Sequence, residues 1–208
     1  MIARESILYI AVLSLLSLIL YIMSPALAIA PVLVLLFVIF FFRNPPRQVT
    51  PNNNHILSAA DGTVQSIQEI DEDTFIKGRA IKISIFLSLL NAHINRSPVN
   101  GQITYTSYRP GQYLPAFKSH ASDINERNTL GIENGPIKIL VHQITGFVAR
   151  RIVCYNQKGD YLQQGQIFGL IKFGSCTEIV VPADIQILVQ KGQKVQAGIT
   201  VIGVLKND

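Results

Sequence analysis

Residues 167–182 read IFGLIKFGSCTEIVVP and contain two runs of β-branched and large apolar side chains, residues 167–173 and 178–182. Between the runs stand Gly174 and Ser175. β-Branched and aromatic residues are enriched in strands, and glycine tends to interrupt them. The stretch therefore predicts two strands separated by a break at Gly174-Ser175.

Similar short apolar runs fill the chain beyond residue 54, and Gly, Asn and Asp residues separate them. Helical periodicity is scarce in this region, apart from a short turn predicted at residues 88–91. We therefore expect residues 48–208 to form a mainly β domain, a β-rich sandwich. The further predicted strands are residues 62–67, 80–85, 101–108, 137–143 and 146–155.

A short internal repeat lies near the C-terminus. Gln157-Lys158-Gly159, followed by Gly165, recurs as Gln190-Lys191-Gly192, followed by Gly198, with the same internal spacing. Such a pair predicts two related hairpins in one sandwich. The hairpins resemble those of lipoyl- and biotinyl-carrier folds, but neither copy has a lysine in the usual motif at the hairpin tip. The resemblance to carrier folds is therefore one of architecture and not of function.

The N-terminal segment is almost wholly apolar, and residues 7–42 contain no charged side chain. One helix that crosses a bilayer needs about 20 apolar residues. Because Ser24-Pro25 interrupts the segment near its middle, we expect two helices, residues 7–23 and 26–42, in a transmembrane or re-entrant hairpin. Residues 1–47 then form a membrane anchor, and a Pro/Asn-rich link at residues 50–54 leads into the β domain.

Positive residues flank the predicted hairpin: Arg4 precedes it, and Arg43 and Arg47 follow it. By the positive-inside rule both ends lie in the cytoplasm. A cleaved signal peptide is the alternative, since Ala26-Leu27-Ala28 resembles a cleavage site. A second apolar segment would still anchor the chain after such a cleavage.

The composition limits the kinds of binding partner that the chain can have. A formal net charge of +5 suits an anionic surface, either membrane lipid or nucleic acid. The chain has no Trp and no Lys/Arg-rich run interleaved with aromatic residues, so we expect no nucleic-acid partner. The two cysteines, Cys154 and Cys176, make neither a disulfide framework nor a metal-ligand cluster, so we expect no metal and a reducing compartment.

The dipeptide Gly174-Ser175 is suited to an acyl shift. Glycine adopts strained backbone angles, and the hydroxyl of the following serine can attack its unobstructed carbonyl. Taken alone, however, a Gly-Ser pair most often marks a turn.

The surrounding motifs give the dipeptide a context. They occur in the same order, from the end of the anchor to the dipeptide, as in the short bacterial phosphatidylserine decarboxylase proenzymes, which this chain closely resembles. The motifs are FFRNP (residues 41–45), ADGTV (60–64), NAHINRSP (91–98), NERN (125–128), GFVARRIV (146–153), KGD (158–160) and GLIKFGS (169–175).

The resemblance implies a self-cleaving enzyme. The chain would cut itself into a large chain, residues 1–174, and a small chain, residues 175–208, which stay together as a heterodimer. Ser175 would become a covalent pyruvoyl group, with no pyridoxal phosphate. Its Schiff base with phosphatidylserine would release CO₂ and give phosphatidylethanolamine. The expected location is the bacterial inner membrane, with the catalytic domain on the cytoplasmic side.

The resemblance also implies supporting residues. The family's Asp-His-Ser arrangement makes Asp61 and His93 candidates for activating Ser175. Taken alone, Asp61-Gly62 is typical of a turn and His93 of a packed imidazole.

Longer relatives carry a second histidine where this chain has Arg96. Arg96 could bind the substrate phosphate or carboxylate, or form a structural ion pair. His142 could contribute to the site, or could be a satisfied core residue. Cys176 stands where close relatives are expected to carry arginine.

Two other functions fit parts of the sequence. A non-enzymatic, membrane-tethered β-sandwich adaptor would account for the anchor and the repeat, but not for the context of Gly174-Ser175. A serine hydrolase using Asp61, His93 and Ser175 lacks the Gly-x-Ser-x-Gly elbow.

Overall fold

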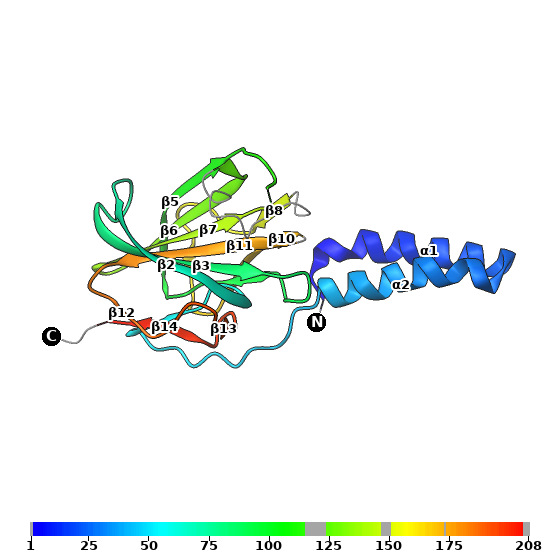
Figure 1. Cartoon of the computed structure of the whole chain (residues 1–208), viewed down its shortest axis with the longest axis horizontal. Coiled ribbons are helices and arrows are strands. Elements are labelled where there is room, and N and C mark those ends of the chain that lie inside the picture. The colour runs from blue at the N-terminus through cyan, green and yellow to red at the C-terminus, as the bar shows by residue number, and fades with distance from the viewer. Residues whose placement is uncertain (1, 115–123, 147–150, 173, 206–208) are drawn as a thin grey trace. The chain divides into compact units, whose positions relative to one another are not determined.

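The computed structural model describes residues 2–114, 124–146, 151–172 and 174–205. The chain divides into two compact units, Met1–Pro46 and Arg47–Asp208. The first unit is helical and the second is a β structure (Figure 1).

The helical unit is a hairpin of α1 (Ile7–Met23) and α2 (Pro25–Phe41), preceded by the 3-10 turn η1 (Arg4–Ser6). Ser24 is extended and separates the helices, and Pro25 begins α2, where its missing N–H costs nothing. The two ends of the hairpin meet, since the Ala3 N–H donates to the Phe42 carbonyl at 2.9 Å. Helix α1 has the predicted bounds, and α2 begins and ends one residue earlier than predicted.

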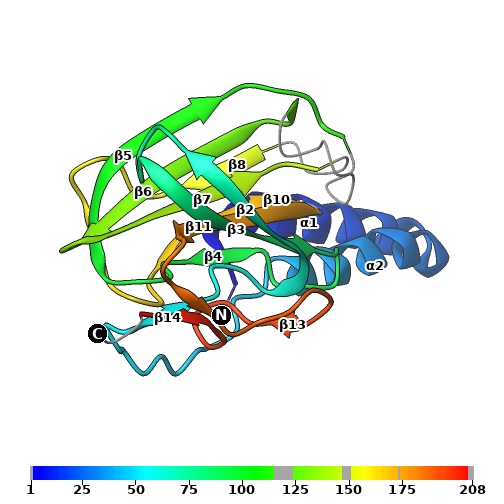
Figure 2. The ribbon, with the colours of Figure 1, turned by 60° about the vertical axis from the view of Figure 1, so that its left-hand side comes forward.

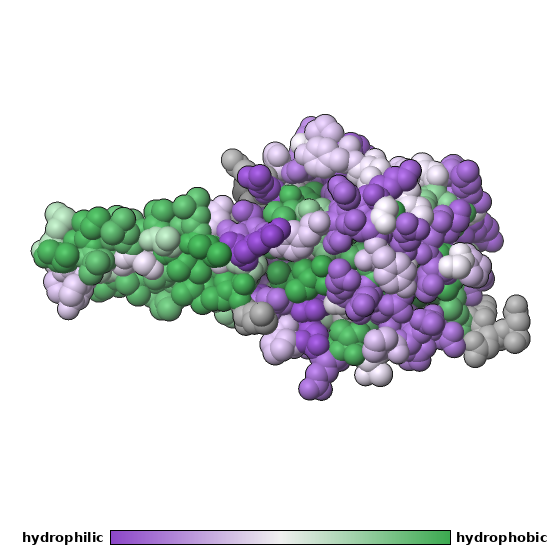
Figure 3. All heavy atoms as spheres, turned by 180° about the vertical axis from the view of Figure 1, so that it is seen from behind, coloured by the Kyte–Doolittle hydropathy of each residue, from purple (hydrophilic) through white to green (hydrophobic). Residues whose placement is uncertain are grey.

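The surface of this hairpin is apolar on the face that Figure 3 shows, with no polar stripe along it. Residues 4–23 form a helix of 20 residues that is long and apolar enough to cross a membrane, and α2 is a shorter apolar helix. Exposed large apolar side chains on both helices are unfavourable in water, because each leaves apolar area hydrated. The hairpin therefore fits membrane association.

The β unit contains one large curled sheet and two small sheets (Figure 2). Among the described residues, the large sheet has the order β13-β2-β3-β11-β7-β6-β5-β9, and the small sheets are β1-β14-β12 and β4-β10-β8. The main core lies on one face of the large sheet, where it packs against side chains from both small sheets, such as Ile202 and Phe168. The strands are β1 (His55–Leu57), β2 (Gly62–Glu72), β3 (Gly78–Leu87), β4 (Ile94–Arg96), β5 (Gly101–Arg109), β6 (Arg127–Asn134), β7 (Ile137–Ile144), β8 (Arg151–Cys154), β9 (Tyr161–Leu162), β10 (Ile167–Lys172), β11 (Ser175–Pro182), β12 (Gln186–Ile187), β13 (Lys194–Val195) and β14 (Val201–Val204).

The order of the large sheet is that of two equivalent halves joined at β11 and β7. On one side run β11, β3, β2 and β13, and on the other run β7, β6, β5 and β9, with antiparallel pairing throughout. Each half also contributes one small sheet. We call residues 94–172 the inserted half, and residues 55–87 with 175–204 the split half, because the first interrupts the second along the chain.

The equivalence holds residue by residue. The β2–β3 ladder has a bulge directly after Val64, and the β5–β6 ladder has one directly after Ile103, 39 residues later. The sequence SAADGTV at residues 58–64 corresponds to SPVNGQI at residues 97–103. The four glycines of the predicted repeat all have left-handed φ angles, between 71° and 101°. The repeat is thus present as two equivalent turns, whereas the kinship with carrier folds stays a prediction.

The two halves differ at one hairpin. In the inserted half, β6 turns directly into β7 through Gly135 and Pro136. In the split half, β3 and β11 pair in the same way, but β3 leaves into the inserted half and β11 returns from it. Ser175, the first residue of β11, pairs with Leu87, the last of β3, so it lies where a hairpin has been opened.

The mainly β fold predicted from the sequence is confirmed, and most predicted strands lie within observed ones. Strand β11 begins at Ser175 rather than at residue 178. Strand β6 was not predicted, because its first residues, Arg127, Asn128 and Thr129, are polar. Of the predicted strand at residues 146–155, β8 covers Arg151–Cys154, and residues 147–150 lie outside the described residues, as does Phe173.

Candidate active site

Ser175 is wholly buried at the start of β11. Its Oγ has no hydrogen-bond partner among the residues that the structure describes. An unpaired buried hydroxyl costs about 1–3 kcal/mol, and such a group in a native protein calls for an explanation. A reactive hydroxyl held next to a peptide bond is one such explanation.

Gly174 has a φ angle of +64°, in the left-handed region that favours glycine. Of the residues that the structure describes, a Cβ built at this position would meet only Leu89 Cδ2, at 3.8 Å, so these neighbours leave room for a larger residue. The backbone conformation therefore selects glycine here. It turns the chain sharply directly before Ser175.

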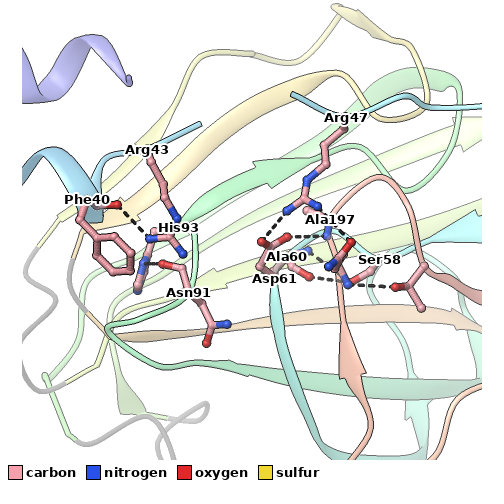
Figure 4. Close-up of polar contacts among 11 residues, drawn as sticks. Phe40, Arg43, Arg47, Ser58, Ala60, Asp61, Asn91, His93 and Ala197 are labelled. Carbon is pink, nitrogen blue, oxygen red and sulfur yellow. Dashed lines mark hydrogen bonds and ion pairs between the residues drawn. The ribbon is translucent and has the colours of Figure 1, made fainter. Parts of the chain in front are cut away.

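His93 lies beside this turn and is 2% exposed. The Gly174 N–H donates to its Nε2 at 3.2 Å, and its Nδ1 lies 3.0 Å from the carbonyl of Asn91, a contact that Figure 4 shows. A carbonyl only accepts, so Nδ1 carries the proton, and Nε2 must offer its lone pair. The imidazole is thus neutral, with its basic nitrogen at the residue that precedes Ser175.

The segment that leads from β3 to His93 is held by a local turn. Asn91 Oδ1 accepts hydrogen bonds from the Ser88 N–H at 2.9 Å and the Ser88 hydroxyl at 2.7 Å. The His93 carbonyl accepts from the Ile171 N–H at 3.2 Å. The two segments that join the halves therefore run side by side, and this brings His93 to Gly174.

Asp61 lies in a separate group of polar contacts (Figure 4). Arg47 Nη2 donates to its Oδ2 at 2.6 Å, and the Ala197 N–H donates to its Oδ1 at 2.8 Å. Neither carboxylate oxygen contacts His93, so the structure does not join the two residues as the Asp-His-Ser arrangement led us to expect. The Asn91 carbonyl orients the imidazole instead.

The inserted half contains a structural counterpart of Asp61. Asn100 is its equivalent, and Asn100 Oδ1 accepts from the Gln164 N–H at 2.8 Å, as Asp61 Oδ1 accepts from the Ala197 N–H. An amide thus makes the same bond without a charge. What distinguishes Asp61 is the ion pair with Arg47, whose side chain is 13% exposed.

Arg96 belongs to the same group as Asp61. Its Nη1 donates to the Gly165 carbonyl at 3.0 Å. Burial and the nearby Arg47 lower the pKa of Arg96, while Asp61 opposes them. These contacts favour the structural interpretation of Arg96.

His142 lies on the opposite face of the large sheet from Ser175. It pairs with Glu178 across β7 and β11, and successive side chains of a strand point to opposite faces. Its Nδ1 lies 2.8 Å from the Thr129 hydroxyl. Burial, and then Arg127 and Lys82, lower the pKa of His142 to about 3, so it is neutral at pH 7. A cavity of about 230 Å³ adjoins it, lined also by Glu72, Tyr105 and Glu178.

Cys176 also lies on that face and packs against Ile144 and Phe86. Burial raises the pKa of its thiol well above the ordinary value, so the thiol stays protonated. A position expected to carry arginine in relatives therefore holds an inert apolar group that points away from Ser175. Among the described residues, no group of three or more His, Cys, Asp or Glu side chains is arranged to hold a metal ion.

A chain of four hydrogen-bonded polar side chains, of which Asn95, Gln143 and Thr177 are buried, was missed by the sequence analysis. Asn128 Nδ2 donates to Gln143 Oε1 at 2.9 Å, Gln143 Nε2 donates to Asn95 Oδ1 at 2.9 Å, and Asn95 Nδ2 donates to Thr177 Oγ1 at 3.0 Å. We call these four residues the amide network. Thr177 lies two residues after Ser175, on the same face of β11. The signal in the sequence is weak: when the sequences of the two halves are aligned over their full length, these four polar residues stand opposite apolar ones.

The comparisons with known proteins agree with this site. The model of the phosphatidylserine decarboxylase family matches residues 34–203. The phosphatidylserine decarboxylase proenzyme of Carboxydothermus hydrogenoformans is 57% identical over 175 residues, which cover 84% of this chain and 82% of the relative. That of Symbiobacterium thermophilum is 48% identical, with 81% and 79% covered, and that of Chlorobium phaeobacteroides (strain DSM 266) is 40% identical, with 86% and 84% covered.

The site and the fold fit a proenzyme in which a left-handed glycine directly precedes a buried serine. The chain belongs to the phosphatidylserine decarboxylase family, whose members are carboxy-lyases. This membership excludes the non-enzymatic adaptor that the anchor and the repeat alone would have allowed.

Proposed function

We propose that this chain cuts itself between Gly174 and Ser175 and then decarboxylates phosphatidylserine with a pyruvoyl group made from Ser175. One observation carries the proposal: a buried serine hydroxyl, without a hydrogen-bond partner among the described residues, follows a left-handed glycine whose N–H donates to a neutral histidine. The relatives named as proenzymes support it.

The proposed cleavage uses His93 as the base. Nε2 takes the proton of the Ser175 hydroxyl, and Oγ attacks the carbonyl carbon of Gly174. The Gly174–Ser175 C–N bond then breaks as the Ser175 nitrogen takes a proton, which leaves an ester. Loss of the Ser175 α-proton expels the Gly174 carboxylate and gives dehydroalanine. Water then releases ammonia and leaves a pyruvoyl group.

The described residues fit such a group. The group would occupy the buried position of Ser175, where the Oγ has no hydrogen-bond partner among the described residues. When present, the pyruvoyl group supplies a ketone that condenses with an amine and accepts electrons as the carboxylate leaves. His93, whose Nε2 accepts from the Gly174 N–H directly before Ser175, is suited to hold or move the proton that this chemistry requires.

The two proposed chains would stay together after the cut. Strand β11 lies between β3 and β7, and ladders join it to both. The small chain, residues 175–208, also contributes β12, β13 and β14 to sheets that contain strands of the large chain. This pairing supports a heterodimer of the chain's own fragments.

The remaining candidates receive supporting roles. Asp61, with Arg47, would brace the loop before β2 and only indirectly affect the cut. Arg96 would support the turn between β9 and β10 through the Gly165 carbonyl rather than bind the lipid phosphate. His142 has no part in the cut, because its ladder position puts it on the other face of the sheet.

We further propose that the helical hairpin anchors the enzyme in the bacterial inner membrane, with the β unit on the cytoplasmic side. The apolar surface of the hairpin supports the anchor, and Arg4, Arg43 and Arg47 at its ends support the orientation. The lipid substrate would then reach the enzyme within the leaflet.

Ser175→Ala tests the proposal, with Ser66→Ala on β2 as the matched control. Both variants are expressed with the full chain in membranes, and the chains are separated on a denaturing gel. We expect Ser66→Ala to yield two chains and phosphatidylethanolamine, and Ser175→Ala to yield one chain and no product. Formation of phosphatidylethanolamine by Ser175→Ala would overturn the proposal.

A further inference from the structure

The amide network connects the two segments that carry the proposed active site. Asn95 stands two residues after His93, and Thr177 stands two residues after Ser175. The hydrogen bond between Asn95 Nδ2 and Thr177 Oγ1, 3.0 Å long, therefore ties the His93 segment to the Ser175 strand. Asn95 belongs to a small sheet and Thr177 to the large sheet, so this bond also joins two layers of the fold.

The rest of the network fixes the orientation of Asn95. Gln143 lies opposite Thr177 on β7, and Asn128 lies opposite Gln143 on β6, so three of the members form a row across the large sheet. Gln143 Nε2 donates to Asn95 Oδ1, which leaves Asn95 Nδ2 to donate to Thr177. Asn95, Gln143 and Thr177 are each 0% exposed, which excludes direct contact with a lipid in this conformation.

The equivalent position of each network residue, in the other half, shows what the fold holds where there is no site. The residues equivalent to the network are all apolar, and they pack in or against the main core. Buried polar groups are costly, and an apolar core serves the same architecture. Folding alone therefore does not require the network. The equivalent pairs are Asn95 and Ile56, Thr177 and Ile139, Gln143 and Val181, and Asn128 and Ile81.

We infer that Asn95, Thr177 and Gln143 are positioning residues for self-cleavage and decarboxylation, an inference that rests on the proposed function. Apolar contacts are non-directional, whereas hydrogen bonds fix distance and angle between the groups they join. The network sets where Ser175 lies relative to His93. After the cut, the peptide bond no longer joins Gly174 to Ser175, and the network holds the start of the small chain against the large chain.

Thr177→Val tests the inference, because valine keeps the shape of threonine and removes the hydroxyl. We expect the self-cleavage rate to fall by about tenfold or more, since small misplacements of reacting groups have effects of that size. The thermal midpoint should remain close to that of Ile139→Val, the control at the equivalent position. Thr177→Ser should restore the rate. For the processed enzyme we expect kcat to fall with KM unchanged.

The outcomes separate this inference from the proposed function. Wild-type cleavage rates in Thr177→Val would overturn the positioning role while leaving self-cleavage intact. The role would equally fail if the rate fell only in step with the thermal midpoint and Thr177→Ser did not restore it. An uncut wild-type chain would instead count against the proposed function itself.

A fourfold variant adds a second measurement. Asn95→Ile, Thr177→Ile, Gln143→Val and Asn128→Ile together place at each network position the residue that stands at its equivalent in the other half. We expect a folded chain with the circular dichroism of the wild type that stays uncut for at least tenfold longer. Normal cleavage by this folded chain would overturn the inference, and Thr177→Val decides if the fourfold variant does not fold.

Discussion

The two halves of the β unit share their ladders, a bulge and their glycine turns. They differ at one hairpin, and the candidate active site lies at the hairpin that is open. In the inserted half the β6–β7 hairpin is closed, and Ile137 begins β7. In the split half the equivalent hairpin is open, and Ser175 begins β11 at the position equivalent to Ile137. Opening the hairpin allows the small chain to begin at a strand that is already paired on both sides.

Comparing the inserted half with the split half separates residues that stabilise the fold from residues that serve the reaction. Features present in both halves, such as the bond that Asp61 and Asn100 each accept, are explained by the fold. Features that have no counterpart at the equivalent positions, such as the amide network and His93, require another explanation. The following experiments use one half as the control for the other.

The largest effect is expected for His93→Ala. Loss of the base should slow cleavage by about 10²–10⁴-fold, the range that general bases contribute. His55→Ala, in the other half, is the control and should cleave normally. Cleavage is followed on denaturing gels after synthesis, and normal cleavage in His93→Ala would remove the imidazole from the mechanism.

Gly174→Ala compares two glycines with similar backbone angles. Gly174 has a φ of +64° and Gly135, in the closed hairpin, a φ of +58°. Alanine in this region costs about 1–2 kcal/mol, so both variants should lose similar stability in urea unfolding. Only Gly174→Ala should slow cleavage, by roughly tenfold. Equal cleavage rates in the two variants would show that the left-handed conformation of Gly174 has no part in the reaction.

Asp61→Asn separates charge from structure. The new amide can still accept from the Ala197 N–H, as Asn100 does from Gln164, but the pair with Arg47 is lost. We expect stability to fall by about 1–3 kcal/mol, less than for a fully buried pair, and the cleavage rate of the folded chain to be unchanged. A chain of normal stability that cleaves slowly would make Asp61 part of the catalytic machinery.

The smallest expected effect is the contribution of His142 to the loss of folding stability at acidic pH. Burial lowers the pKa of His142 in the folded chain to about 3, whereas the ordinary value is 6.5. Between these values the unfolded chain binds a proton that the folded chain does not, so stability is lost as the pH falls below 6.5. The contribution is at most about 1.4 kcal/mol per pH unit.

His142→Val, which places the residue of the equivalent position, Val180, at this site, should flatten that slope. The measurement is urea unfolding of the uncut Ser175→Ala chain in detergent at pH 7, 6 and 5. An unchanged slope in His142→Val would assign the acid sensitivity to other groups.

Much of this architecture follows from local patterns in the sequence. The apolar segment with its break at Ser24-Pro25 predicts the helical hairpin, and β-branched runs such as residues 101–108 predict strand centres. The junction at Gly174-Ser175 follows from the glycine between two such runs together with the family motifs. These features depend on residues that are near neighbours in the chain.

The rest depends on contacts between distant residues. Asp61 and His93 are 32 positions apart, and nothing in either motif shows that Arg47 and Ala197 take both carboxylate oxygens. The amide network joins residues up to 82 positions apart, and its members resemble ordinary polar residues at strand ends. Only the register of the sheets shows that these polar side chains face the core.

The intact mass of the purified wild-type protein tests the central claim most directly. The account predicts two species, a large chain ending at Gly174 and a small chain of residues 175–208 that lacks a free amino terminus and is lighter by one ammonia. A single species with the full 23.0 kDa mass, in a preparation that forms phosphatidylethanolamine, would contradict it.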